Sequence, residues 1–319
     1  MIKNVLLLGG SGFVGTWIAN RLSQRGVNVT IPTRRRERNK ANIMLPQVEV
    51  VEANINDESQ LTALMRDQDA VINLVGILHD HDSRLPYGKG FDAAHAQLPK
   101  KIITAMKTAG VRRLVHMSAL GADVNGPSEY LRSKGEGEAA VLASATELDV
   151  TVFRPSVIFG IGDKFLNTFA HILKLAPVFA AGGMSARFQP VYVGNVADAF
   201  VSCIEDVNTF GQVYELCGPK VYTLRELVEY VGTVSGNKRP VYQLNDFWAY
   251  LQAGLLWLLP DPPMSPDNLR SMDVDNVASA GGQTYPGWNP AALEAVAPTY
   301  LGKVAPKSKL DGFRLHAGR

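Results

Sequence analysis

The stretch Val5-Leu6-Leu7-Leu8-Gly9-Gly10-Ser11-Gly12-Phe13-Val14-Gly15 carries a short apolar strand into a glycine-rich turn and then into a helix. Glycines lack a Cβ, so this turn can be tight and can approach a diphosphate closely. The helix directs unpaired N–H groups and its positive dipole end at that anion. Gly10-x-Gly12-x-x-Gly15 fits the dinucleotide fingerprint, and Gly9-x-x-Gly12-x-x-Gly15 fits its longer-spaced variant. Glycine triplets also arise by chance, but this context favours a cofactor turn over a turn without ligand. The predicted contacts are Gly9, Gly10, Ser11, Gly12, Phe13, Val14 and Gly15.

Composition excludes several functional classes. The chain has 319 residues and a net charge of +2, so nothing in it demands a nucleic-acid partner. Its two cysteines, Cys203 and Cys217, form no metal-spaced cluster and predict a reducing compartment. The longest apolar run, 247–259, is interrupted by Gln252 and is too short to span a membrane. We expect a cytoplasmic protein, with peripheral attachment to the inner face of a membrane as the alternative.

Strand and helix patterns alternate through the first half of the chain. This alternation, with nearly continuous apolar strands, predicts an α/β fold with a Rossmann-type doubly wound parallel sheet. Ligands of such sheets bind beyond the carboxyl ends of the strands. The expected strands are 4–8, 28–33, 48–52, 70–74, 113–118 and 150–154, and the expected helices are 14–24, 58–67, 93–108 and 129–144.

The rhythm changes after Pro155, where proline and glycine become frequent and strands shorten. We expect residues 1–155 to form the nucleotide-binding core, with later segments returning to it. Residues 156–302 are expected to form a smaller substrate lobe, and 303–319 a basic tail. The expected strands of the second half are 190–193, 213–217 and 240–244, and its helices are 165–175, 196–203, 224–235, 245–258 and 291–300.

The end of the second strand indicates which nicotinamide cofactor the chain prefers. An acid there favours NAD through the ribose 2′-hydroxyl, whereas an arginine accepts the 2′-phosphate of NADP. This chain has Thr33-Arg34-Arg35-Arg36, and its first acid is Glu37. The guanidinium fork suits a phosphate, so Arg34 and Arg35 predict NADP(H) in preference to NAD(H). The alternative is a solvated charge run on a loop.

The ends of the next two strands give weaker placement arguments. Asn54 and Ile55 follow the third strand and are expected to line the adenine. Leu74, Val75 and Gly76 follow the fourth strand, where Gly76 lets the backbone approach the cofactor.

A tyrosine and a lysine four residues apart, Tyr130 and Lys134, lie on one face of a predicted helix. Ser118 ends the fifth strand, twelve residues before Tyr130. A nearby ammonium lowers the pKa of a phenol, which is ordinarily near 10. Such a tyrosine can exchange a proton with a substrate oxygen that Ser118 holds by a hydrogen bond. The alternative is the start of an ordinary amphipathic helix.

These motifs carry a family resemblance. The glycine turn, Ser118, Tyr130-x-x-x-Lys134 and Arg154-Pro155-x-x-x-x-Gly160 resemble the short-chain dehydrogenase/reductase superfamily in its extended or atypical branches. The resemblance covers residues 1–240. It implies a Rossmann fold, NAD(P)(H) bound with help from Tyr130, Lys134 and Pro155, and catalytic roles for Ser118, Tyr130 and Lys134.

Four further stretches resemble one atypical subfamily. It contains the nucleotide-binding accessory subunit of mitochondrial complex I and its bacterial relatives. The stretches are Val115–Ala122, Tyr130–Glu136, Tyr214–Pro219 and Tyr222–Leu227. Two functions follow as alternatives. One is an oxidoreductase or epimerase/dehydratase-type enzyme for a small, apolar or quinone-like substrate. The other is a non-catalytic NADPH-binding subunit of a respiratory or quinone-synthesis assembly. In place of the asparagine that the extended branch often carries early in its fourth helix, residues 92–97 read Asp-Ala-Ala-His-Ala-Gln, which leaves the usual proton relay open.

Three remaining features have competing interpretations. His79-Asp80-His81-Asp82 is interpreted as a solvated loop rather than a metal site, because alternate loop residues rarely converge on one ion. The aromatic-rich segment 245–258 is interpreted as core packing rather than a membrane-facing surface, because it lacks flanking cations. Arg187 is either a substrate contact or a surface residue, and the sequence does not separate the two.

Overall fold

The computed structural model describes residues 1–82, 84–260 and 262–302, without the side chains of residues 38 and 40. The chain divides into two compact units. The first comprises residues 1–155, 194–216 and 281–286; in the part that the structure describes, the second comprises 156–193, 217–280 and 287–302. The expected basic tail lies outside the described residues.

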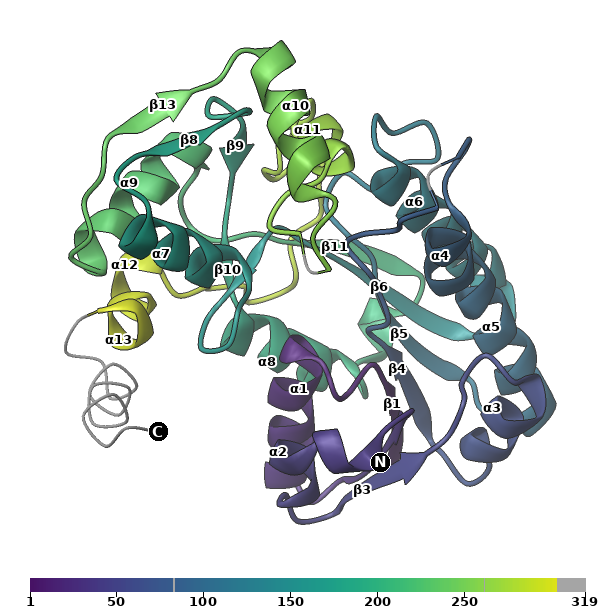
Figure 1. Ribbon diagram of the computed structural model, residues 1–319. Helices are drawn as coiled ribbons and strands as arrows, with labels where there is room; N and C mark the ends of the chain where they lie inside the picture. Colours follow the sequence, from purple (N-terminus) through teal and green to yellow (C-terminus); the bar gives the residue numbers. More distant parts are fainter. Residues whose placement is uncertain (83, 261, 303–319) are drawn as a thin grey trace. The chain divides into compact units, whose positions relative to one another are not determined.

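A parallel sheet forms the centre of the first unit. In the described part of the chain it has seven strands in the order β11-β6-β5-β4-β1-β2-β3 (Figure 1). The strands are β1 (Asn4–Leu8), β2 (Asn28–Thr33), β3 (Val48–Glu52), β4 (Ala70–Asn73), β5 (Arg113–Met117), β6 (Asp149–Pro155) and β11 (Gln212–Leu216). Every pairing is parallel, as in Val5 with Val29 and Val5 with Ala70. The strand order reverses at β1 and β4, so the carboxyl ends of these two strands flank the crevice where such sheets bind ligands.

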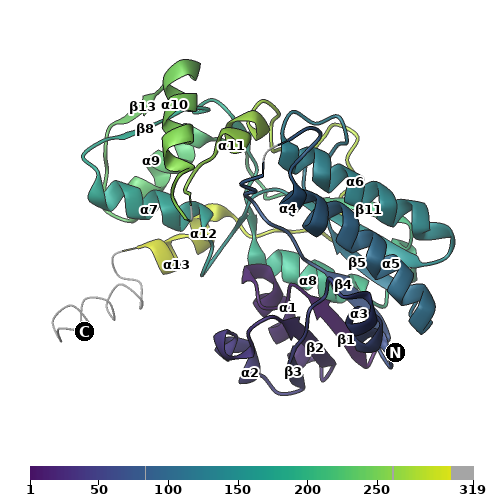
Figure 2. The same ribbon diagram turned by 45° about the vertical axis from the view of Figure 1, so that its right-hand side comes forward.

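Helices cover both faces of this sheet, as Figures 1 and 2 show. They are α1 (Phe13–Gln24), η1 (Arg36–Arg38), α2 (Lys40–Ile43), α3 (Glu58–Met65), α4 (Lys89–Phe91), η2 (Asp92–Gln97), α5 (Leu98–Ala109), α6 (Glu129–Ala143), η3 (Ser144–Thr146), α8 (Val193–Cys203) and η4 (Val207–Thr209). Leu6 and Leu8 of β1 are fully buried among the apolar side chains of α3 and α5. Val5 and Leu7, which alternate with them, are fully buried as well, and this burial on both faces explains the unbroken apolar strand.

The second unit has its own apolar core around Phe159, Leu173 and Leu227. Its strands pair as β7 (Ile158–Phe159) with β10 (Val191–Tyr192), β8 (Phe179–Ala181) with β13 (Val241–Gln243), and β9 (Arg187–Phe188) with β12 (Tyr222–Thr223). Its helices are α7 (Phe165–Leu175), α9 (Leu224–Val234), α10 (Asp246–Leu256), α11 (Pro266–Ser271), α12 (Leu293–Val296) and α13 (Pro298–Leu301).

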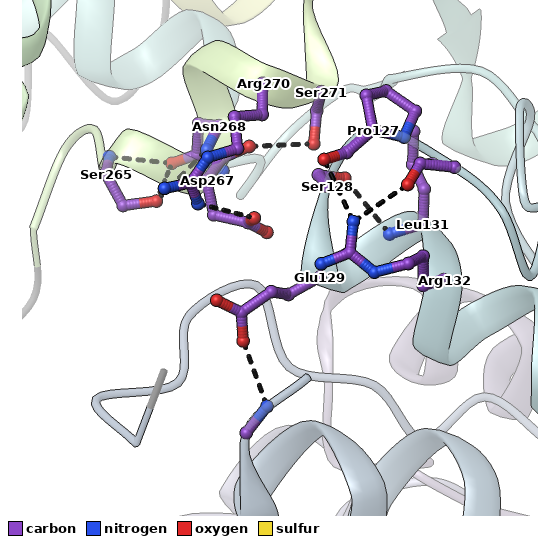
Figure 3. Close-up of polar contacts among 12 residues, drawn as sticks. Pro127, Ser128, Glu129, Leu131, Arg132, Ser265, Asp267, Asn268, Arg270 and Ser271 are labelled. Atoms are coloured by element: carbon purple, nitrogen blue, oxygen red, sulfur yellow. Dashed lines mark hydrogen bonds and ion pairs between the residues drawn. The ribbon is translucent and has the colours of Figure 1, made fainter. Parts of the chain in front are cut away.

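Side-chain caps fix where several of these helices begin. Thr223 and Glu226 form a capping box at α9, and Ser265 and Asn268 form one at α11, which Figure 3 shows. The helix expected at 291–300 is divided at Pro298, which has no N–H to continue it.

The expectation that segment 245–258 packs into a core is wrong for most of its side chains. Helix α10 buries Ala249 and Ala253, whereas Phe247 is 69% exposed and Leu255 is 63% exposed. Small residues form the inward stripe, so the aromatic side chains lie on the outer side. In the described residues, no helix is both long and apolar enough to cross a membrane.

Candidate functional site

All of the predicted site residues lie in the first unit, at the carboxyl edge of its sheet. The glycine turn follows β1, the arginines follow β2, and Asn54 and Ile55 follow β3. Leu74, Val75 and Gly76 follow β4, Ser118 follows β5, and Pro155 is the last residue of β6. Because these strands are parallel, their carboxyl ends share one edge, and the structure brings the predicted residues to it.

The glycine turn is closely packed against the loop that follows β4. Gly9 has φ +79°, and a Cβ there would lie 3.0 Å from the carbonyl carbon of Leu74. A Cβ on Gly15 would lie 2.5 Å from the Cα of Gly10, so only a glycine at this position lets α1 pack this closely against the turn. The glycines therefore bring β1, α1 and the β4 loop together at the point where strand order reverses.

The turn leaves several backbone donors available. Helix α1 begins after Gly12 with no side-chain cap and no acidic residue in its first turn. Among the described residues, the N–H groups of Ser11, Phe13 and Val14 have no acceptor. Such donors at a helix N-terminus suit a phosphate. The turn thus fits a dinucleotide both in the backbone approach it permits and in the donors it presents.

Arg34 and Arg35 are exposed, and their guanidinium groups form no hydrogen bond or ion pair with the described residues. Arg36 is tied back instead, since its Nε donates to the Val50 carbonyl at 3.0 Å and it pairs with Glu37. Of the three arginines, the first two are therefore available to an incoming anion.

Asn54 and Ile55 line the start of the loop after β3. Asn54 is exposed, and its N–H donates to Oε1 of Gln60, while Ile55 is partly buried against the core. The loop after β4 is more constrained, because Leu74 is 7% exposed and the Val75 N–H donates to Oδ1 of Asn73 at 3.1 Å.

Ser118 and Lys134 are both buried near the carboxyl end of β5. Lys134 is 4% exposed, and its Nζ donates to the carbonyl of Met117, the residue before Ser118, at 2.7 Å. Ser118 is 3% exposed, and its Oγ has no hydrogen-bond partner among the described residues. A buried hydroxyl without a partner is costly unless a ligand satisfies it.

The expected lowering of the tyrosine pKa is not what the structure indicates. Burial raises the pKa of Tyr130 to about 12, and burial lowers the pKa of Lys134 to about 8, partly opposed by Glu138. The ammonium of Lys134 is directed at the Met117 carbonyl. Tyr130 is therefore a protonated hydroxyl at neutral pH.

A hydrogen-bond chain through His95 reaches the backbone of Tyr130. The Ile77 N–H donates to Nε2 of His95 at 3.0 Å, which assigns the ring proton to Nδ1. Nδ1 then donates to Oγ of Ser133 at 2.8 Å, and Ser133 donates to the Tyr130 carbonyl at 2.9 Å. Burial, with Lys134 and His116, holds the pKa of His95 well below its usual value, so the ring is neutral.

The start of α6 is fixed by side chains around Tyr130. Ser128 Oγ accepts the Leu131 N–H, Glu129 accepts the Gly88 N–H at 3.0 Å, and Arg132 donates to the Pro127 carbonyl (Figure 3). Arg132 Nε also donates to the Pro86 carbonyl. These contacts tie the long loop after β4 to the helix that carries Tyr130.

The sequence interpretation missed several polar residues of this edge. Asn42 donates to the Gly10 carbonyl, Asn73 bonds to His116, and Glu138 pairs with Arg154. Nothing in local spacing marks Asn42, whereas residues 92–97 did mark the region of His95.

Two further features of the sequence, the loop that contains Asp80 and the side chain of Arg187, make contacts within their own units. Asp80 accepts the N–H groups of Asp82 and Phe91, so it orders its own loop. Arg187 pairs with Asp275 in the second unit, and this pairing lowers the pKa of Asp275.

The parallel sheet and its glycine turn define a dinucleotide-binding protein of the Rossmann class. A family model described as the NAD dependent epimerase/dehydratase family matches residues 5–217, and the chain belongs to that family.

Two relatives are similar over most of the chain. One is NADH dehydrogenase [ubiquinone] 1 alpha subcomplex subunit 9, mitochondrial, of Arabidopsis thaliana. It is 33% identical over 70% of this chain, but the match spans only 56% of that protein's own length. The other is the NADH-ubiquinone oxidoreductase 40 kDa subunit, mitochondrial, of Neurospora crassa, 29% identical over 92% of this chain and 78% of the relative. The Bordetella bronchiseptica enzyme WbmF in complex with NAD+ shares the fold, with 22% identity, a TM-score of 0.64, and coverage of 87% of this chain and 88% of that one.

Proposed function

We propose that the protein is an NADP(H)-dependent oxidoreductase or epimerase/dehydratase-type enzyme whose acid–base group is Tyr130. The observation that carries this proposal is the buried Ser118 hydroxyl, which has no hydrogen-bond partner in the part of the chain that the structure describes, beside the hydrogen bond from Lys134 to Met117. A non-catalytic fold would lose little by satisfying or removing such a hydroxyl. A substrate oxygen would satisfy it.

In this proposal a bound nicotinamide dinucleotide supplies hydride-transfer chemistry. Ser118 Oγ–H donates a hydrogen bond to the substrate oxygen and orients it. Tyr130, protonated at neutral pH, gives its hydroxyl proton to that oxygen in the reductive direction. Lys134, with a pKa of about 8, is mostly cationic at pH 7, and in this proposal its ammonium leaves the Met117 carbonyl to stabilise the phenolate.

The preference for NADP(H) rests on Arg34 and Arg35. Both are exposed at the end of β2 with no side-chain partner among the described residues, and the first acid that follows them in the sequence, Glu37, pairs with Arg36. A 2′-phosphate can pair with either guanidinium. We propose a small carbonyl or quinone-like substrate and a cytoplasmic location.

Calorimetric titration with NADPH and NADH tests cofactor binding. We expect tighter binding of NADPH and a smaller gap in Arg34→Ala; equal affinities in the wild-type protein would contradict the preference. Oxidation of NADPH with 9,10-phenanthrenequinone or a short-chain ubiquinone analogue tests catalysis. Turnover should be lost in Tyr130→Phe and retained in Tyr250→Phe, a matched change on exposed α10.

A second candidate function is a non-catalytic NADPH-binding subunit of a respiratory or quinone-synthesis assembly. Similarity to mitochondrial NADH dehydrogenase subunits and the exposed aromatic side chains of α10 favour it. Such a protein would be peripheral to the membrane. Co-migration of the natively expressed protein with a membrane complex, unaffected by Tyr130→Phe, would support this function, and migration alone would count against it.

A further inference from the structure

The glycine turn has a buried side-chain contact from outside the fingerprint. Asn42, in the short helix α2, is fully buried, and its Nδ2 donates to the carbonyl oxygen of Gly10 at 2.9 Å. The same Nδ2 donates to Oδ1 of Asn39 at 2.9 Å. The side chain of Asn42 thus holds the Gly10 carbonyl, in the middle of the turn, toward the protein interior.

This contact determines where the next N–H points. Gly10 C=O and Ser11 N–H belong to one planar trans peptide, in which the two groups point in opposite directions. Because Asn42 holds the oxygen in the interior, the Ser11 N–H is directed away from it. Ser11 is exposed, and its N–H has no acceptor among the described residues.

The turn cannot easily hold this peptide by other means. The Gly10 N–H donates to the Leu7 carbonyl at 3.2 Å, which fixes the preceding peptide only. Glycine on one side of the peptide allows its plane to rotate at little steric cost. A side-chain donor on the oxygen therefore supplies the orientation that the sequence of the turn leaves free.

We infer that Asn42 is a positioning residue for the dinucleotide, acting through the Gly10–Ser11 peptide to aim the Ser11 N–H at the diphosphate. The inference rests on the proposed cofactor binding and names a residue 27 positions after Gly15, the last residue of the glycine motif. Asn42 acts on the diphosphate end of the ligand, whereas Arg34 and Arg35 act on the 2′-phosphate. The backbone of α2 keeps its own bonds, such as Asn42 N–H to the Asn39 carbonyl, when the side chain is removed.

The test separates these two ends with three ligands. We expect Asn42→Ala to weaken NADPH and NADH by the same factor, about tenfold for one lost oriented donor. Adenosine 2′-monophosphate, which has no diphosphate, should bind the variant and the wild type equally. Arg34→Ala should show the reverse pattern, with NADPH and adenosine 2′-monophosphate weakened and NADH unchanged.

A matched control measures the effect of stability alone. Thr151→Val removes another buried hydrogen bond of this unit, from Thr151 Oγ1 to the Thr209 carbonyl at 2.8 Å, and should leave all three affinities unchanged. Asn42→Ser is a second variant should Asn42→Ala not fold. Wild-type affinity for NADPH in a folded Asn42 variant, or a parallel loss of adenosine 2′-monophosphate binding, overturns the inference alone. A wild-type protein that binds neither dinucleotide overturns the proposed function as well.

Discussion

Nδ1 of His95 lies 2.8 Å from Oγ of Ser133, and this contact connects the π-helical turn η2 to the start of α6. The π-helical turn η2 presents the ring, which meets Tyr130 edge-on at a centroid distance of 5.5 Å. A Cβ on Gly137 would lie 1.9 Å from the His95 carbonyl, so glycine in α6 permits this approach. Local π-helical turns are frequent at functional sites.

Replacement of His95 by phenylalanine should keep the ring contacts and remove both hydrogen bonds. We expect a loss of about 2 kcal/mol in the free energy of unfolding, because the Ile77 N–H loses its acceptor and Ser133 loses its donor. Urea denaturation at pH 7.5 measures this loss. Ser133→Ala also removes two hydrogen bonds, those with His95 and with the Tyr130 carbonyl, and leaves the buried Nδ1–H of His95 without its acceptor, so we expect a similar loss.

The pH dependence of stability gives a second readout of the same residue. The folded-state pKa of His95 is lowered, so below pH 6.5 the unfolded state binds more protons than the folded state. Wild-type stability should therefore fall as pH decreases from 6.5 to 5. His116, whose pKa is also lowered by burial, contributes in the same direction. His95→Phe should have a shallower slope, and an unchanged slope would contradict the buried neutral ring.

Lys134 is expected to lower the free energy of unfolding of the protein. Its folded-state pKa of about 8 is below the usual 10.5, so between these values the unfolded state binds more protons and stability rises with pH. Below pH 8 the full cost of burying the ammonium remains. Lys134→Met should therefore raise the free energy of unfolding at pH 7 by about 1–3 kcal/mol and flatten the rise from pH 8 to 10.

Chemical denaturation of both proteins across this range measures the difference. Tyrosines with raised pKa values act in the opposite direction only above pH 10, and the comparison of variant with wild type removes their effect. If the variant were less stable at pH 7, the hydrogen bond to Met117 would outweigh the burial of charge. Under the proposed function, we also expect the stabilised Lys134→Met variant to lose turnover.

Local pattern predicted most of the fold of the first unit. The expected strands 4–8, 28–33 and 48–52 agree with β1, β2 and β3, because each apolar run ends at a glycine, an arginine run or a polar turn. The expected helix 93–108 is present, although it begins earlier and contains a π-helical turn. Parallel strands made the common edge of the site residues predictable as well.

Tertiary contacts explain what the pattern could not predict. Asn42 reaches Gly10 across a gap of 32 residues, and no local spacing encodes that approach. The pKa of Tyr130 depends on burial rather than on the lysine four residues later, so helical spacing alone gave the wrong direction. In α10 the apolar composition suggested a buried helix, whereas the buried residues that this helix contributes are the small side chains Ala249 and Ala253.

Arg154 of β6 should be a strong determinant of stability. Its guanidinium makes a two-pronged contact with Glu138, which is 3% exposed, and this pairing raises the pKa of Arg154. Arg154→Met leaves the buried carboxylate without its cation and should cost about 3 kcal/mol. Arg112→Met is the matched control, because its pair with Asp149 is more exposed and should be worth about 0.5 kcal/mol or less. Equal losses in the two variants would show that burial of Glu138 does not matter.

Two glycines of the turn should separate stability from binding. A Cβ on Gly15 meets backbone atoms of Gly9 and Gly10 at 2.5 Å, so Gly15→Ala must displace α1 from the turn. A Cβ on Gly12 meets only the Gly9 carbonyl oxygen, at 3.2 Å, and Gly12 has φ −81°, which alanine adopts without strain. Gly15→Ala should therefore lose about 2 kcal/mol or more of stability, whereas Gly12→Ala should fold nearly as well as the wild type.

Gly12→Ala should nevertheless bind NADPH about tenfold or more weakly, because its methyl group stands where the diphosphate approaches the N-terminus of α1. Thermal denaturation and calorimetric titration of the two variants measure both effects. A Gly12→Ala protein with wild-type affinity for NADPH would mean that the diphosphate is bound somewhere other than this turn.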